Sequence, residues 1–504
     1  MTMTTDNLKA KTARGLMWGA VNNGTMQVLN LLIGIVILRH VTPEDTGLVG
    51  MLAIFAAIAG NVQSSGFSTA LINEQKPTGA QYNSVFWFNI LMGGAIYLLL
   101  FASAPLIAAF FHQPRLTALS RFLFLAFFVS SFGISANAYM VKNMMNREIT
   151  IVNVAALTVS GTTAIVMAVG GKGYWALATQ QVVNALVLVA GRFVFVARRG
   201  ADGVGPWRPS PSFSFGYIRQ TFAFSMGILV TMIVNTVNQN MLTVIFGRLF
   251  RDPRPVGNFF QAYKWDQMAF QTVGGMLSQV AQPVLVSVRH ERQRELHVFR
   301  KMVRFASLLA FPALLGLALV AREFIVCTIG TRWEACVPLL QLLCLSGAFM
   351  PLYTLLQNLV ISHGRSDVNM WLNVGQIVLQ LAVILLFAQG GITVMVMAYS
   401  VFNIVWIAAW VPFARRLVGL RWRHLLADTA PFLGIAAAVM GTTHVLTAML
   451  MPLLAALSPT ASLWLLLALR VVVAAALYFA ALRLLRVAIL RECLQFIRKK
   501  SVNQ

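Results

Sequence analysis

Acidic side chains are scarce in this sequence, which has 15 Asp and Glu against 39 Lys and Arg in 504 residues. Almost all of the acidic residues lie in polar segments or at the ends of apolar runs. The sequence contains no paired carboxylates, no His and Cys at metal-ligand spacing and no glycine loop that could cradle phosphates. These absences argue against an enzyme and against a nucleotide-driven pump, and we expect no cofactor.

Cysteine is also rare, with four residues in the chain. Cys327 and Cys336 flank one short predicted periplasmic loop, where the compartment would allow a disulfide. Cysteines in membrane segments are mostly small apolar residues, and we expect these two to be so. A disulfide between them stays open as the alternative.

Long hydrophilic segments are missing, so the sequence predicts no separate soluble domain. The chain is 58% hydrophobic and 11% charged, and its mean hydropathy is +0.74. This composition is typical of a polytopic membrane protein. The N-terminus lacks the short apolar core of a signal peptide and is interpreted as a cytoplasmic lead-in.

Apolar runs separated by short polar segments predict an all-α polytopic membrane protein with about 14 transmembrane helices. The predicted spans are residues 15–38, 47–72, 82–110, 116–141, 148–170, 174–197, 218–247, 257–287, 303–328, 336–361, 368–389, 391–414, 427–450 and 462–486.

The net charge of +24 indicates membrane topology rather than nucleic-acid binding. Lys and Arg are about threefold more frequent on one side of the predicted membrane, and positive residues are enriched in cytoplasmic loops. We therefore expect an even number of spans with both termini cytoplasmic, and no nucleic-acid partner.

The two halves of the chain show signs of a repeat. At a constant offset, Asn61 and Ser68 in the second span correspond to Gln271 and Ser278 in the eighth. Equivalent spans keep their orientation, so the repeat is predicted to be parallel.

This repeat predicts two pseudo-symmetric six-helix lobes plus two C-terminal helices. The predicted parts are an N-lobe (1–197, spans 1–6), a Pro-, Gly- and Ser-rich cytoplasmic linker (198–217), a C-lobe (218–414, spans 7–12), two further spans (415–486) and a basic cytoplasmic tail (487–504).

Polar residues recur at steps of three and four along spans 1, 2, 7 and 8, so each of these helices has one polar face. A polar row facing lipid would be costly. We predict a central hydrated cavity lined by Asn23, Gln27, Asn30, Asn61, Asn235, Gln239, Lys264 and Gln271. For a single amide, an interhelical hydrogen bond stays open as the alternative, and Lys264 could instead extend to the periplasmic interface.

Asp266 is the one carboxylate well inside a predicted span. It is the candidate for ion coupling by proton exchange. Alternatively, it neutralises an arginine near the periplasmic end of span 1 or 7. Arg39 and Arg248 lie at those ends and are predicted to be periplasmic gate charges. A net positive interior would suit an anionic substrate.

Six short motifs carry a resemblance to a known family, mainly through their order along the chain. They are residues 39–47 (RHVTPEDTG), 64–72 (SSGFSTALI), 207–209 (WRP), Gly257 with 261–264 (QAYK), 278–283 (SQVAQP) and 338–341 (PLLQ). In these motifs the chain resembles the polysaccharide-transporter branch of the multidrug/oligosaccharidyl-lipid/polysaccharide (MOP) exporters, and most of all Wzx-type flippases. Relatives often have an acidic residue where this chain has Ser64, so a coupling role at that position does not carry over.

The resemblance implies a flippase of exopolysaccharide or lipopolysaccharide assembly in the bacterial inner membrane. Its substrate would be an oligosaccharide on undecaprenyl diphosphate, moved from the cytoplasmic to the periplasmic leaflet by alternating access and coupled to an ion gradient. The implied partners are this substrate, membrane lipids, and the polymerase and chain-length regulator of the same pathway.

Two other classes of protein stay open. A drug exporter of the same superfamily is expected to have carboxylates in its cavity for a cationic drug, and only Asp266 qualifies. A membrane enzyme of polysaccharide assembly needs a sizeable periplasmic loop or a catalytic domain, and the predicted loops are short.

Overall fold

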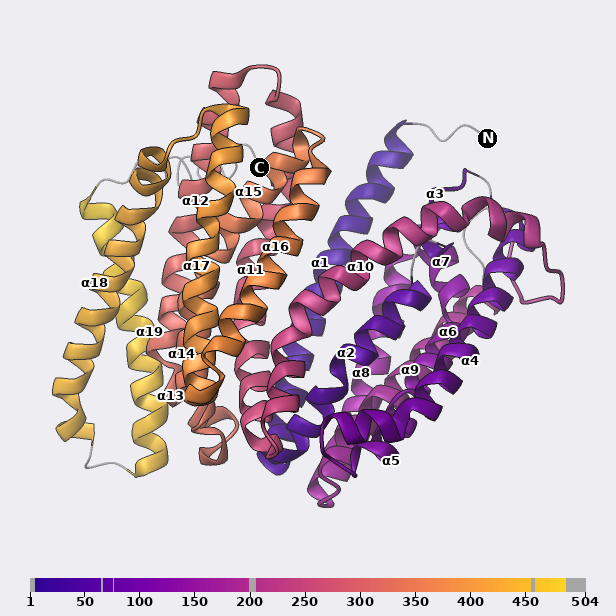
Figure 1. Cartoon of the computed structure of the whole chain (residues 1–504), viewed down its shortest axis with the longest axis horizontal. Helices are drawn as coiled ribbons and strands as arrows, with labels where there is room; N and C mark the ends of the chain where they lie inside the picture. The colour runs from indigo at the N-terminus through magenta and orange to yellow at the C-terminus, as the bar shows by residue number, and fades with distance from the viewer. Residues whose placement is uncertain (1–4, 65–66, 76, 199–204, 455–457, 486–504) are drawn as a thin grey trace. The chain divides into compact units, whose positions relative to one another are not determined.

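The computed structural model describes residues 5–64, 67–75, 77–198, 205–454 and 458–485 (Figure 1). All regular elements in these ranges are helical, which confirms the all-α prediction. The chain divides into two compact units, unit 1 (Met1–Gly257) and unit 2 (Asn258–Gln504). This division falls within a helix beyond the predicted linker, and the lobe boundaries given above stay a prediction. The predicted tail, 487–504, lies outside the described residues.

Unit 1 contains ten helices in its described part and the first residues of an eleventh. They are α1 (Thr5–His40), α2 (Pro43–Ser64), α3 (Phe67–Asn73), α4 (Gly79–Phe110), α5 (Leu116–Leu123), α6 (Leu125–Phe132), α7 (Ile134–Lys142), α8 (Asn146–Val169), α9 (Tyr174–Arg198), α10 (Phe215–Leu249) and the start of α11 (Pro253–Val288).

Unit 2 contains the rest of α11, eight further α-helices and two short 3₁₀ helices in its described part. They are α12 (Arg292–Leu319), α13 (Ala321–Thr328), η1 (Thr331–Trp333), α14 (Cys336–Gly347), α15 (Met350–Ser362), α16 (Ser366–Leu386), η2 (Ala388–Gly390), α17 (Gly391–Val418), α18 (Trp422–Leu454) and α19 (Pro459–Leu484).

Eleven helical segments among the described residues are long and apolar enough to cross a membrane, or twelve if the bent segment Leu116–Phe132 with Ile134–Lys142 is one span. The chain is therefore a multi-pass membrane protein. The helices α10 and α11 are not among these segments, and both carry residues of the predicted polar faces. The full count of fourteen spans is thus not established by length and apolarity alone.

The packing of unit 1 is organised by α8, which lies against both α1 and α9. Polar groups join the first pair: Asn153 Nδ2 donates to Asn22 Oδ1 at 3.2 Å, and Thr150 Oγ1 donates to the backbone oxygen of Trp18 at 3.4 Å. Part of the polarity of α1 therefore serves helix packing. A second pair is formed by α10, which packs along α2.

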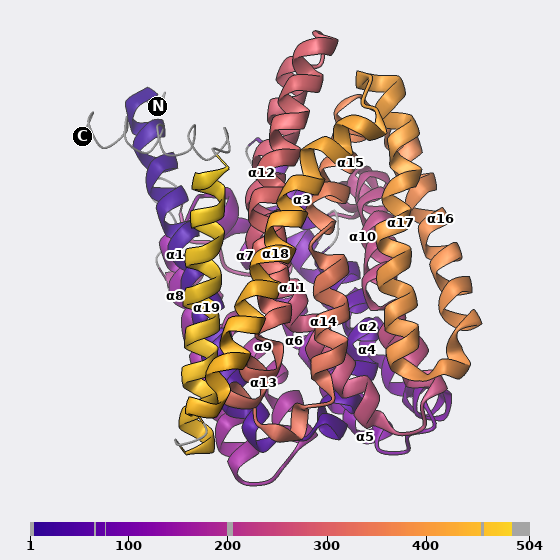
Figure 2. The same ribbon diagram turned by 90° about the vertical axis from the view of Figure 1, so that its left-hand side faces the viewer.

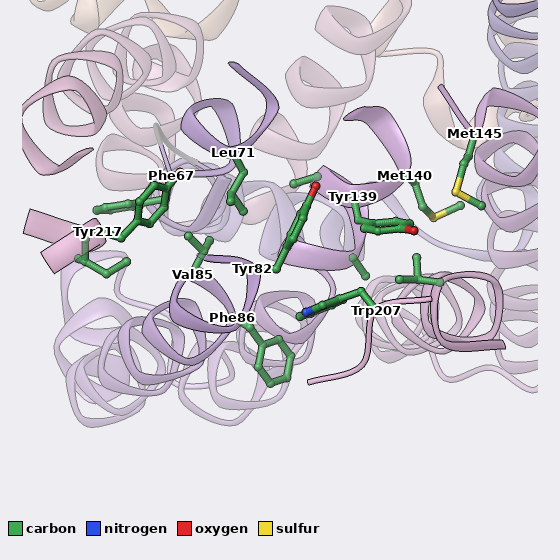
Figure 3. Packing of buried hydrophobic residues seen from close by; sticks show 14 residues of the cluster. Phe67, Leu71, Tyr82, Val85, Phe86, Tyr139, Met140, Met145, Trp207 and Tyr217 are labelled. Atoms are coloured by element: carbon green, nitrogen blue, oxygen red, sulfur yellow. The ribbon is translucent and has the colours of Figure 1, made fainter. Parts of the chain in front are cut away.

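The segment that precedes α10 is docked on unit 1 rather than extended into solvent. Trp207 packs among Tyr82, Phe86 and Tyr139 in a buried aromatic cluster (Figure 3). Its indole Nε1 donates to Asn83 Oδ1 at 3.0 Å, and Asn83 Nδ2 donates to Ser210 and Ser212 at 2.6 and 2.8 Å. The Trp-Arg-Pro motif thus fixes the described end of the predicted linker, from residue 205 onward, to α4 and α7.

The last two helices, α18 and α19, run beside each other in unit 2, and α18 packs along α12 (Figure 2). A buried ion pair links α19 to α13: Arg470 Nη1 lies 2.8 Å from Glu323 Oε2. Arg470 also donates to Thr447 Oγ1 and to the backbone oxygen of Leu319, both at 3.2 Å. These helices are therefore tied to the rest of unit 2 by polar contacts as well as by apolar packing.

Candidate functional site

The polar face of α1 is exposed in unit 1. Asn23, Gln27 and Asn30 are all exposed, and their spacing of four and three places them on one side of the helix. Within unit 1 the long contact of α1 is with α8 alone, so apolar residues such as Val28 are exposed too. An exposed amide says more about the surroundings of α1 than an exposed apolar residue does, because lipid would not satisfy the hydrogen bonds of the amide.

The polar residues of α10 divide into two groups. Asn235 and Gln239 are exposed, as the cavity prediction requires. Thr236 is buried and accepts a hydrogen bond from Asn61 Nδ2 of α2, which also donates to the backbone oxygen of Met232 at 3.3 Å. Asn61 is half-buried, and in this structure it joins two helices. Sequence reasoning missed Thr236, although it lies next to a residue that was selected.

The first turns of α2 and α11 pack backbone against backbone in unit 1, and a glycine in each helix allows this close approach. A Cβ on Gly47 would overlap the carbonyl oxygen of Pro253, and a Cβ on Gly257 would overlap the carbonyl oxygen of Pro43. The contact is reciprocal, with each glycine lying against the proline that begins the other helix. This explains in physical terms why both motifs contain glycine at that position.

The remaining residues of the first motif organise the start of α2. Thr42 and Asp45 cap the helix reciprocally, with Thr42 N donating to Asp45 Oδ2 at 3.1 Å and Asp45 N donating to Thr42 Oγ1 at 3.2 Å. The other oxygen, Asp45 Oδ1, accepts from Tyr174 N of α9 at 3.0 Å. Glu44 pairs with Arg115 at 2.9 Å. The motif therefore has a structural role in unit 1.

The two predicted gate charges lie at the ends of α1 and α10. Arg39 is exposed in the last turn of α1. Arg248 is exposed in the last turn of α10, where its Nη1 lies 2.8 Å from His112 Nε2 and its guanidinium lies over the ring of Phe110 at 5.4 Å from the centroid. The structure thus shows what holds Arg248, and the gate role stays a prediction.

In unit 2, α11 presents different residues to different surroundings. Lys264 and Gln271 are exposed, whereas Asp266 is only 4% exposed. Asp266 lies against Gly347 of α14 so closely that a Cβ there would overlap its Oδ1. That oxygen has no hydrogen-bond partner. Among the described residues Asp266 forms no ion pair, so an arginine partner for it is not found there.

A buried hydrogen-bond network joins α15, α16 and α17 in unit 2. Tyr353 Oη lies 2.7 Å from Asn373 Oδ1 and 2.9 Å from Gln376 Oε1, and it accepts from Gln357 Nε2 at 2.9 Å. Gln376 Nε2 continues the network to Asn403 Oδ1 at 3.1 Å. Sequence reasoning missed this network, although its amides recur at helical spacing along α16.

The predicted site residues are divided between the two units. Those of α1, α2 and α10 belong to unit 1, and those of α11 belong to unit 2, so a shared cavity stays a prediction. Cys327 and Cys336 are buried, as expected for small apolar residues, and the alternative disulfide between them is not formed. No group of three possible metal ligands occurs in the part of the chain that the structure describes.

The fold is that of membrane transporters. The structure aligns with the lipid II flippase MurJ in an inward closed conformation with a TM-score of 0.66, covering 93% of this chain and 99% of that one at 12% identity. It also aligns with an inward-facing multidrug resistance MATE family transporter of the MOP superfamily with a TM-score of 0.62, covering 78% of this chain and 94% of the other at 13% identity. At such identities these likenesses define the fold alone.

The chain belongs to the polysaccharide biosynthesis protein family, whose profile matches residues 36–338. Similar proteins include the lipopolysaccharide biosynthesis protein WzxC of Escherichia coli (24% identity, 73% of each chain) and the teichuronic acid biosynthesis protein TuaB of Bacillus subtilis (26%, 73% of this chain and 72% of TuaB). The succinoglycan biosynthesis transport protein ExoT of Rhizobium meliloti is 24% identical over 85% of this chain and 83% of its own length.

Proposed function

We propose that this protein is a flippase that moves lipid-linked oligosaccharide across a bacterial inner membrane for polysaccharide assembly. The observation that carries the proposal is the row of exposed amides, with one exposed lysine, on helices otherwise built from apolar residues. Membership of the polysaccharide biosynthesis family and the flippase-like fold support the same substrate class.

The chemistry of the exposed residues suits such a substrate. Sugar hydroxyls lose water on entering a protein and need amide partners, which Asn23, Gln27, Asn235 and Gln239 can supply. A diphosphate needs a cation, and Lys264 offers an exposed ammonium on α11. The proposed cavity is the one predicted from sequence, and the lipid tail would stay in the bilayer. The polymerase and the chain-length regulator of the same pathway are further proposed partners.

The proposed topology has about fourteen spans, with α10 and α11 crossing the membrane in addition to the more apolar segments. Their lengths support this, since α10 runs over 35 residues and α11 over 36. We place both termini in the cytoplasm, on the basis of the Lys and Arg asymmetry. The reciprocal crossing of Gly47 and Gly257 supports a parallel repeat, because each half contributes the same pair of groups.

The proposal is tested in proteoliposomes that contain the purified chain and a fluorescent polyprenyl-diphosphate oligosaccharide. An enzyme or quencher that cannot cross the membrane reports which leaflet holds the sugar. We expect the protein to accelerate exchange between leaflets, and to leave a fluorescent phospholipid unaffected. Equal exchange of both lipids would indicate a non-specific scramblase and contradict the proposal.

Asp266 is the proposed coupling residue, because it is a buried carboxylate without a counter-charge among the described residues. Burial without a partner makes the ionised form of such a group costly, so the carboxylate takes up a proton when it is buried and can release it when the cavity opens to water. With Asp266→Asn, substrate exchange without a gradient is expected to persist and acceleration by an imposed pH gradient to be lost. A variant that responds fully to the gradient would show that coupling lies elsewhere.

A further inference from the structure

A basic pocket lies in unit 2, where α17 ends and α18 begins. It has a volume of about 850 Å³ and is lined by Val411, Pro412, Arg415, Arg416, Arg421, Trp422 and Arg423. Four of these seven residues are arginines, and all four are exposed. The pocket thus combines a cationic rim with a short apolar wall.

The local backbone explains why the arginines converge. Gly419 ends α17 in the left-handed conformation with φ of 78°, and the chain turns there to begin α18 three residues later. Arg292 of α12 donates to the backbone oxygens of Arg415 and Arg416 at 3.3 and 3.0 Å, which caps the end of α17. The carbonyls are therefore satisfied, and the side chains of both residues remain available.

The charge of the pocket is not balanced by nearby carboxylates. The nearest acidic residue along α18, Asp428, already binds Arg300 and Arg304 of α12, each at 2.6 Å. In the described ranges, none of the four pocket arginines forms an ion pair. A cluster of this kind attracts an anion, and arginine binds phosphate in bidentate geometry.

The position of the pocket indicates that the anion it attracts is the phosphate of a lipid headgroup. It lies at the ends of two segments that are apolar enough to span a membrane, Ala388–Val418 and Trp422–Leu450. Trp422 is 44% exposed at this boundary, where tryptophan is enriched at the level of lipid headgroups. Basic pockets between membrane helices bind anionic headgroups on the cytoplasmic side.

We propose that this pocket binds the headgroup of an anionic phospholipid, with Arg415, Arg416, Arg421 and Arg423 on the phosphodiester and Trp422 at the glycerol level. The site differs from the proposed substrate cavity and does not depend on the flippase activity. The lipid would be a resident ligand that holds the connection between α17 and α18 at the membrane surface.

The test titrates the full-length protein in detergent with phosphatidylglycerol and, separately, with phosphatidylcholine, and counts bound lipids by native mass spectrometry. We expect phosphatidylglycerol to bind preferentially. Arg421→Gln/Arg423→Gln should weaken that binding by about fivefold per arginine. The matched control is Arg289→Gln/Arg294→Gln, which removes two charges from exposed arginines on neighbouring segments of unit 2 and should leave affinity unchanged.

Three results would overturn the proposal. Unchanged affinity in a variant with all four arginines replaced by glutamine would show that the pocket binds no lipid. An equal loss in the control pair would indicate diffuse charge attraction instead of a site. Displacement of the lipid by inorganic phosphate at matched ionic strength, with phosphate binding as tightly, would assign the pocket to a free anion. Circular dichroism of each variant confirms that the helices are retained.

Discussion

The amides selected from sequence on α1 and α10 in unit 1 have different surroundings from the amides of α16 and α17 in unit 2. In unit 1 the amides of α1 and α10 that were selected from sequence are exposed, as Asn23 and Asn235 illustrate. In unit 2, Gln376 of α16 and Asn403 of α17 are buried and bonded to each other. The same residue types at the same helical spacing therefore serve two purposes.

The difference shows that polar residues at helical spacing identify the polar face of a helix. They do not show whether that face meets protein, water or substrate. A buried amide in a membrane helix must find a partner within the protein, because lipid offers none. An exposed amide must find water, substrate or another chain segment. Variants should therefore separate the two groups: the buried residues should affect stability, and the exposed ones should affect transport.

The largest effect on stability is expected at the buried ion pair of unit 2. Arg470→Met leaves Glu323, whose side chain is 4% exposed, without its partner. Removing one member of a buried pair typically costs about 3–5 kcal/mol. We therefore expect a marked fall in the apparent Tm of the purified protein, measured by thermal unfolding in detergent.

A double variant and a surface control complete this experiment. Glu323→Gln/Arg470→Met removes both charges and should recover most of the stability. Arg332→Gln changes an exposed arginine and should shift stability by less than about 0.5 kcal/mol. If Arg470→Met were as stable as the double variant, leaving Glu323 without its partner would have no cost. The ion pair would then contribute little to stability.

A smaller loss of stability is expected from the hydrogen-bond network. Tyr353→Phe removes the hydroxyl that contacts Gln357, Asn373 and Gln376. Leaving buried polar groups unpaired costs about 1–3 kcal/mol, again visible as a lower apparent Tm. The control is Tyr97→Phe, whose hydroxyl makes a longer bond of 3.3 Å to the backbone oxygen of Arg121. Equal Tm values for the two variants would argue against a network.

Most of the helices could be predicted from sequence, because most predicted spans are strongly apolar and bounded by polar segments. Their breaks could not. The predicted span 116–141 is three helices with a 45° bend beyond Phe132, and the predicted span 336–361 is two, α14 and α15. Breaks depend on tertiary packing, which leaves little trace in hydropathy.

The candidate site was only partly predictable for a related reason. Periodicity identified polar faces on α1 and α10 whose selected residues are exposed in unit 1, but it does not report which partner a polar group meets. Asn61 was selected as a cavity residue, and its amide bonds to Thr236. Arg470 was visible as a charge inside a span, but Glu323, its partner 147 residues earlier, could be found only from the fold.

Among the exposed polar residues, substitutions of Lys264 are expected to change transport and not stability. Lys264→Glu reverses the charge that we assign to the diphosphate, and flipping should fall by about tenfold or more, corresponding to roughly 1.4 kcal/mol. Lys264→Arg should retain more activity than Lys264→Ala. Polysaccharide export by a deletion strain that carries each variant provides the measurement.

Lys172→Glu is the matched control for Lys264. It reverses the charge of another exposed lysine, in the turn between α8 and α9, and should export at the wild-type level. Normal export from a well-expressed Lys264→Glu protein would instead favour a lysine that only extends to the membrane interface.

The smallest effect on stability is expected for single cysteines on the exposed face of α1. The starting protein has Cys327, Cys336, Cys344 and Cys493 replaced by alanine, and Asn23, Gln27 or Asn30 is then changed to cysteine. These side chains are exposed, so stability should change by less than about 0.5 kcal/mol. A charged maleimide should label them quickly, because a thiol reacts as the thiolate, which forms readily only in contact with water.

Two controls decide whether labelling reports water or exposure alone. Val472→Cys lies on α19 at a position that is 64% exposed on an apolar face, and it should react at least about tenfold more slowly, because lipid excludes the charged reagent. Asn22→Cys replaces the residue that bonds to Asn153 and should also be slow. If Asn23, Gln27 and Asn30 react no faster than Val472, the polar face of α1 does not line a hydrated cavity, and its amides must be satisfied within the protein as those of α16 are.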